Sequence, residues 1–202
     1  MQDQNVIGNT MGLVRNNILN VEKLTVGADK KEKQEPSNKI KEIREKLYVD
    51  LARIIKLFPS KTPTDILLCA EDIPCFHGDY QTTIYILNIK IDDAVDLLQC
   101  VKDTQRKYEI KTKISNWRYV IKELEGNQKA FEEANALYEK FREDYSGEIE
   151  VVFSQEVKNK MVEFDVFRNN AFGMPGHCIK EDTVRIIKDE VIFAMRKDLG
   201  TL

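Results

Sequence analysis

The chain has 202 residues, which is the length of one large domain or of one domain with an additional arm. Hydrophobic residues make up 42% of it and charged residues 32%, which is enough apolar material for a core and a composition typical of helical surfaces. The formal net charge of −3 excludes a uniformly basic nucleic-acid binder, although not a local basic patch. The apolar runs fall far short of the roughly 20 residues that span a bilayer, and no secretory signal is recognised, so we expect a cytoplasmic protein.

The first 25 residues carry an apolar stripe with helical spacing. Ile7, Met11, Val14 and Ile18 recur three or four residues apart, which predicts an amphipathic helix. Its other face is rich in Asn, a mediocre helix former, so we expect this helix to require a surface on which to dock. Turn formers and charges follow without periodicity. Residues 1–36 are therefore predicted to form a helical arm with a linker, whose four apolar residues bind a protein partner or a second copy of the chain.

Two helices are expected after the linker. Ser37 is a good N-cap, and apolar residues then recur three or four positions apart until Pro59, which ends the pattern. Thr62 followed by Pro63 predicts a second, short helix over residues 63–71, because proline suits the first position of a helix.

Residues 80–91 fit two interpretations. Tyr85, Leu87 and Ile89 alternate with polar residues as in a strand, and residues 148–153 are the one convincing partner for such a strand. The same residues also fit the start of a long helix. We favour the helix, and a short β-hairpin between the two segments is the alternative.

Further helices are expected beyond this segment. Apolar residues continue at helical spacing through Tyr108 to Phe141, with residues 126–127 as a point where the chain could turn. Ser154 is the predicted N-cap of the next helix. A Gly- and Pro-containing loop is expected over residues 169–178, and two acidic residues lead into the last helix, where they suit the positive end of its dipole.

Cysteine and histidine residues gather in two predicted loops. Cys75 and His77 lie in a loop predicted over residues 72–80, and His177 and Cys178 lie in the later one. Zinc takes four ligands of this kind, but the paired two-residue intervals of structural zinc sites are missing. The preferred interpretation is loop residues that bind no metal, and the four cysteines of the chain are expected to be reduced thiols. A zinc-dependent site at the two loops is an alternative function.

No catalytic constellation is recognisable. The chain has no Gly-rich phosphate loop, no Ser elbow and no His-Glu-x-x-His motif. Adjacent His177 and Cys178 point in different directions on most backbones, so they do not suggest an activated nucleophile. Carboxylate pairs such as Asp92 and Asp93 are typical of solvated helix surfaces. We therefore predict no catalytic residues and no cofactor, and expect a protein that is not an enzyme.

Basic and aromatic residues cluster in the segment 102–122. Basic side chains can follow phosphates while aromatic rings stack on bases. The surrounding residues 81–126 hold eight basic and seven acidic side chains, so a solvated helix face of mixed charge explains the pattern equally well. Nucleic-acid binding through 102–122 is therefore an alternative, not the preferred function. The members of the cluster are Lys102, Arg106, Lys107, Lys111, Lys113, Trp117, Arg118, Tyr119 and Lys122.

Three segments together resemble a known kind of protein. They are residues 44–51 (REKLYVDL), 149–157 (IEVVFSQEV) and 194–200 (AMRKDLG). This combination resembles a broad set of uncharacterised bacterial helical-bundle proteins, many of which carry a membrane helix before the bundle. The chain departs from that set, because residues 1–36 are too polar to span a membrane and residues 59–125 look inserted. The resemblance implies a helical bundle of bacterial or phage origin with no established activity.

Together these patterns predict an all-α protein. We expect a bundle of long antiparallel helices over residues 37–202, preceded by the arm of residues 1–36. The expected function is that of a non-enzymatic interaction or scaffold protein that acts through helix surfaces in a coiled-coil-like manner and forms oligomers.

Overall fold

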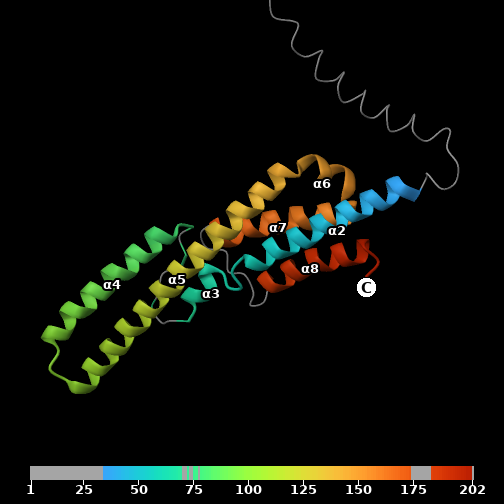
Figure 1. The fold of residues 1–202 in the computed structure, drawn as a ribbon. Helices are drawn as coiled ribbons and strands as arrows, with labels where there is room; N and C mark the ends of the chain where they lie inside the picture. Colours follow the sequence, from blue (N-terminus) through green and yellow to red (C-terminus); the bar gives the residue numbers. More distant parts are fainter. Residues whose placement is uncertain (1–33, 70–71, 73–74, 77, 174–182, 202) are drawn as a thin grey trace, which may run out of the picture. The chain divides into compact units, whose positions relative to one another are not determined.

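The computed structural model describes residues 34–69, 72, 75–76, 78–173 and 183–201, and every secondary-structure element among them is helical (Figure 1). The predicted all-α class is confirmed. The helices are α2 (Gln34–Leu57), α3 (Pro63–Leu67), α4 (Tyr80–Cys100), α5 (Thr104–Asp144), α6 (Ser146–Val152), α7 (Gln155–Gly173) and α8 (Thr183–Asp198). The chain divides into two compact units, residues 1–45 and 46–202, and the packing described below lies within the second.

The segment that fitted both a strand and a helix is helical. Asp79 is the N-cap of α4, and its carboxylate accepts hydrogen bonds from the backbone N–H groups of Gln81 and Thr82. Leu87 is fully buried, whereas Tyr85 and Ile89 are 67% and 43% exposed, which a strand with these residues on one face would not allow. The alternative β-hairpin is wrong, because its second segment lies almost entirely in α6.

The structure differs from the sequence prediction at two positions between residues 80 and 144. The chain breaks at residues 101–103, where Asp103 becomes the N-cap of α5 by accepting a hydrogen bond from the N–H of Arg106 at 2.7 Å. Residues 126–127, which fitted either a turn or a weak point within a helix, do not form a turn, because α5 continues through both positions and buries Asn127. Helices α4 and α5 consequently form an antiparallel pair that is visible side by side in Figure 1.

The remaining helix boundaries agree with the sequence within a few residues. Helix α2 begins before the predicted N-cap Ser37, and α3 is shorter than expected although Thr62 and Asp65 form its predicted N-terminal cap. Ser154 caps α7 by accepting a hydrogen bond from the Val157 N–H. The loop expected over 169–178 is partly wrong, since α7 extends to Gly173 and the rest lies outside the described residues.

Helix α5 runs through two separate hydrophobic cores. The hairpin core lies between α3, α4 and the first half of α5, and the bundle core lies between α2, α6, α7, α8 and the second half of α5. The hairpin core contains Ile66, Leu67, Phe76, Tyr80, Ile84, Leu87, Ile91, Ile110, Ile114, Trp117, Val120 and Leu124. The largest side chains of the bundle core are Tyr48, Phe58, Tyr138, Phe141, Phe153 and Phe164.

Aromatic rings organise the centre of the bundle core. The ring of Phe58, at the end of α2, lies edge-on to Phe131, Tyr138 and Phe164, with ring centroids 5.1 to 6.1 Å apart. Such edge-to-face pairs contribute about 1 kcal/mol each beyond the burial of their area. The C-terminal end of α2 is therefore fixed by rings from both α5 and α7.

Polar contacts place α8 against α2. The Tyr48 hydroxyl donates a hydrogen bond of 2.6 Å to Asp198, and the Lys188 ammonium donates one of 2.7 Å to the carbonyl of Phe58. The last carbonyls of a helix have no partner within the helix, and a lysine satisfies them well. Lys188 thus caps α2 from another helix, and burial lowers the pKa of its ammonium.

Asn127 connects the hairpin core to the loop that follows α2. Its amide donates a hydrogen bond of 2.8 Å to the carbonyl of Lys61, in the loop after α2, and its carbonyl accepts one of 2.7 Å from the hydroxyl of Tyr80, at the start of α4. Burial raises the pKa of the Tyr80 hydroxyl, which keeps it protonated as a donor. The residue that the sequence suggested as a turn is therefore a buried junction.

Candidate functional site

The arm residues predicted to bind a partner cannot be compared with the fold. Ile7, Met11, Val14 and Ile18 lie outside the described residues, so their binding role stays a prediction.

The predicted cysteine and histidine loops are only partly described. Cys75 is exposed and free, as are Cys69 and Cys100, whereas His77, His177 and Cys178 lie outside the described residues. Within the described ranges, no group of three or more His, Cys, Asp or Glu side chains is placed to hold a metal ion. The zinc alternative therefore gains no support from the part of the site that is described.

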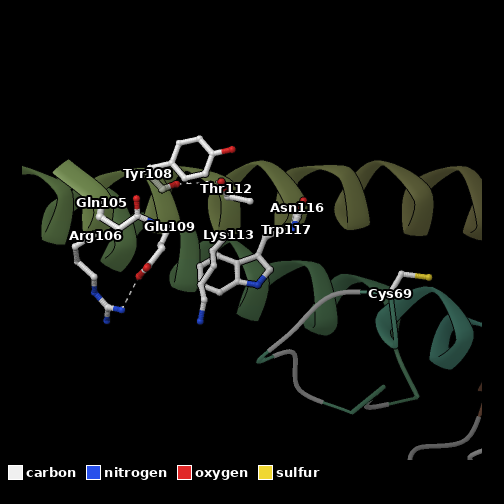
Figure 2. A pocket seen from close by; sticks show the side chains of 9 residues that line it. All are labelled: Cys69, Gln105, Arg106, Tyr108, Glu109, Thr112, Lys113, Asn116 and Trp117. Atoms are coloured by element: carbon white, nitrogen blue, oxygen red, sulfur yellow. Dashed lines mark hydrogen bonds and ion pairs between the residues drawn. The ribbon is translucent and has the colours of Figure 1, made fainter.

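A groove of about 600 Å³ lies between the end of α3 and the first half of α5 (Figure 2). Its lining is mainly polar and comes from Cys69, Gln105, Arg106, Tyr108, Glu109, Thr112, Lys113, Asn116 and Trp117. The Cys69 thiol donates a hydrogen bond to the carbonyl of Asp65, and Figure 2 shows its sulfur directed away from the α5 side chains. No nucleophile faces a general base in this groove.

The charges along the groove are neutralised by neighbours in the fold. The Arg106 guanidinium lies 3.1 Å from the Glu109 carboxylate, and the Lys113 ammonium is paired with Asp72. Lys113 also holds the pKa of the Asp72 carboxyl below its ordinary value, mainly by donating this hydrogen bond. Lys90 donates to the carbonyl of the same Asp72. These contacts attach the segment before α4 to the helix pair, which is a structural role.

A second polar cluster is buried between α5 and α7. The side chain of Arg168 is only 6% exposed, and its guanidinium lies 2.6 Å from Glu139 and 3.4 Å from Asp165. It also donates a hydrogen bond to Asn135. Arg142 reaches the same Asp165 at 2.6 Å. Three of these contacts join α5 to α7, and the fourth, between Arg168 and Asp165, lies within α7.

Burial shifts the pKa values of two groups in this cluster. Desolvation raises the pKa of the Asp165 carboxyl above its ordinary value and outweighs the two neighbouring guanidinium groups, which lower it. Desolvation also raises the pKa of the Tyr138 hydroxyl, over which the Arg168 guanidinium lies 5.0 Å from the ring centroid. The two groups with shifted pKa values, Asp165 and Tyr138, therefore lie where α7 packs on α5.

The basic and aromatic segment 102–122 divides into two sides of α5. Trp117, which the sequence suggested as a stacking residue, is 8% exposed and belongs to the hairpin core. Tyr108, which the sequence placed in the apolar stripe, is 68% exposed, and Tyr119 is 58% exposed. Figure 2 shows the ring of Tyr108 on the opposite side of α5 from Arg106 and Glu109. The ring of Tyr108 thus points away from the Arg106–Glu109 ion pair, while Tyr108 still contributes to the lining of the groove.

One side of α8 alternates exposed apolar and charged residues. Ile186 and Phe193 are 48% and 55% exposed. Glu190 and Lys197 follow each of them by four residues, and this i, i+4 spacing places all four side chains on one side of the helix. Glu190 pairs with Lys160 at 3.0 Å and Lys197 pairs with Glu156 at 2.8 Å, both from α7. We call Ile186, Glu190, Phe193 and Lys197 the α8 stripe.

Comparisons with protein-family models, curated proteins and solved structures found no match for this chain. Among the described helices, none combines the length and the apolar character needed to cross a membrane. The fold and the geometry of the faces described above are therefore the basis for a functional proposal.

Proposed function

We propose that the chain is a non-enzymatic interaction protein that assembles through the surfaces of its helices. The observation that carries the proposal is the α8 stripe, where Ile186 and Phe193 stay 48% and 55% exposed on one side of a helix whose opposite side is packed in the bundle core. Exposed apolar residues arranged on one side of a helix are typical of contact surfaces.

The preferred partner of the α8 stripe is a second copy of the chain. A two-fold interface brings a surface against itself, so the surface must be self-complementary. The stripe suits such an interface because Ile186 and Phe193 are apolar, whereas Glu190 and Lys197 are already neutralised by residues of α7 and need no charged partner in the second copy. The predicted arm of residues 1–36 offers another apolar surface to such an assembly.

The free and exposed state of Cys69, Cys75 and Cys100 supports the proposed cytoplasmic location, because exposed thiols persist in reducing compartments. The bacterial or phage origin stays a proposal that rests on the sequence resemblance alone.

Sedimentation over a range of protein concentrations tests the proposal. We expect the full chain to form dimers or larger oligomers. The double variant Ile186→Asp and Phe193→Asp should shift it towards monomers, because charges on a contact surface oppose association. Tyr85→Asp is the control, since Tyr85 is 67% exposed on α4 and lies outside the stripe.

Deletion of residues 1–33 separates the contribution of the arm from that of the stripe. We expect the deleted chain to keep all described helices and to associate more weakly than the full chain. A chain that is monomeric at every concentration, with or without the arm, would contradict self-association.

A further inference from the structure

The two exposed tyrosines of α5 belong to two copies of one five-residue pattern. Residues 107–111 have the sequence Lys-Tyr-Glu-Ile-Lys, and residues 118–122 have the sequence Arg-Tyr-Val-Ile-Lys. The copies are 11 residues apart, and 11 residues complete three helical turns, so both copies face the same direction. Ile110 and Ile121 pack on the hairpin core, which leaves the tyrosines on the outer side of α5.

Each tyrosine has two cations near it. Lys111 and Lys122 each follow a tyrosine by three residues, which places them beside it on the helix surface, and Lys107 and Arg118 lie one turn before these two lysines. We call these six residues the tyrosine face. Each of its cations is exposed or half-exposed, and within the described part of the chain none of them makes an ion pair.

The helix surface around the tyrosine face is moderately positive. Residues 103–125 hold six basic and four acidic residues, and two of the acidic residues are already engaged, Asp103 as the N-cap of α5 and Glu109 with Arg106. Lys107 also lies near the N-terminal end of α5, where the helix dipole is positive and disfavours a cation. The stability of the helix therefore does not explain the placement of these charges, whereas an anionic ligand would.

We propose that the tyrosine face binds single-stranded nucleic acid. Each ring would stack on a base, and the two cations near it would contact the neighbouring phosphates. The tyrosines are 11 residues apart, which corresponds to about 16 Å along the helix and to about five stacked nucleotides. This length lies within the range of about 4 to 16 nucleotides that single-strand sites occupy.

The tyrosines distinguish this ligand from other anions. An acidic peptide would satisfy the cations but would leave two exposed rings without a role. A duplex would offer phosphates, but its bases are already stacked on one another and cannot stack on the rings. The tyrosine face lies on α5 and does not involve the α8 stripe, so the two proposals can fail independently.

Fluorescence anisotropy with a labelled oligothymidylate of about 15 nucleotides tests the stacking. We expect Tyr108→Ala and Tyr119→Ala each to weaken binding by about tenfold, and Tyr→Phe at either position to retain it, because the ring is what stacks. Tyr85→Ala is the matched control, with 67% exposure against 68% for Tyr108, and it should bind like the parent chain.

The salt dependence of the same binding tests the phosphate contacts. Each contact to a single strand contributes about 0.7 to the slope of log affinity against log salt, so Lys111→Gln with Lys122→Gln should lower the slope by about 1.4. Lys129→Gln with Lys140→Gln changes the charge equally on the second half of α5 and should leave the slope unchanged.

Three results would overturn the proposal. The first is the absence of binding to the oligothymidylate at low salt. The second is unchanged affinity in both tyrosine-to-alanine variants. The third is polyglutamate displacing the oligonucleotide as effectively as unlabelled oligothymidylate does, which would show that the face takes acidic chains in general.

Discussion

The two halves of α5 differ in the sign of their net charge and in how many of their charged side chains form ion pairs. Residues 104–124 hold six basic and two acidic side chains, and four of the cations face outward without an ion pair in the described structure. Residues 125–144 hold three basic and six acidic side chains, and Arg142 and Glu139 among them form contacts with α7. One helix therefore carries a half with outward cations and a half with charges fixed by neighbours.

This difference separates structural charge from charge available to a ligand. A cation that is already neutralised inside the fold, such as Arg168, cannot attract an external anion without breaking a buried contact. A cation on an exposed helix face adds little to stability, because surface charge interactions contribute well under about 1 kcal/mol. The second half of α5 is thus expected to govern stability, and the first half is where binding is expected.

The largest effect is expected for Arg168, which anchors the charged cluster of the bundle half. Arg168→Ala removes a buried guanidinium together with its contacts to Asn135, Glu139 and Asp165, and we expect a loss of about 3 kcal/mol of unfolding free energy, because Glu139 is half exposed and Asp165 keeps Arg142. Arg142→Ala is the control, since its side chain is 43% exposed, and it should cost about 1 kcal/mol or less. Urea denaturation measures both, and equal losses would contradict the distinction.

A smaller effect is expected at the junction between the two halves. Asn127→Ala removes the acceptor of the buried Tyr80 hydroxyl and the donor to the Lys61 carbonyl, and we expect a loss of about 2 kcal/mol. Asn116→Ala lies on the exposed side of the same helix and should change the unfolding free energy by less than about 0.5 kcal/mol. An Asn127 variant as stable as the Asn116 variant would mean that the hairpin core is not coupled to the loop after α2 there.

Periodicity was sufficient to predict the helices but not their junctions. The stripe ending at Pro59 and the N-caps at Thr62 and Ser154 were visible in the sequence, because caps and apolar spacing are local properties. The break at residues 101–103 was missed because α4 and α5 continue the same apolar spacing on both sides of it. Asn127 was misjudged because its partners lie 47 and 66 residues away in the chain.

The outward face of α5 shows why the candidate site was only partly predictable. Tyr108 and Trp117 both fit an apolar helical stripe, and the sequence does not reveal that one is exposed and the other buried. The repeated pattern at 107–111 and 118–122 is present in the sequence, but two copies of five residues do not by themselves indicate a binding surface. The exposure of both tyrosines in the structure is what makes the pattern a candidate site.

The smallest expected effect is a pH dependence of opposite sign in the two regions. In the bundle half, burial holds the pKa of Asp165 above its ordinary value of 3.8. In the hairpin half, hydrogen bonds from Thr82 hold the pKa of Asp79 below that value. Folded Asp165 binds its proton more tightly than the unfolded chain does, so its contribution is present at low pH and is lost as the pH rises through its folded pKa. The contribution of Asp79 is present above the unfolded pKa and is lost as the pH falls.

Two substitutions isolate these contributions, because asparagine does not titrate and keeps the capping ability needed at position 79. As the pH rises from about 3 to 7, the parent chain should lose unfolding free energy relative to Asp165→Asn and gain it relative to Asp79→Asn. Denaturation at several pH values measures both differences. The two differences could instead change in the same direction with pH. In that case the buried Asp165 would titrate like an exposed carboxylate. The contrast between buried charge in the bundle half and solvated charge in the hairpin half would then be wrong.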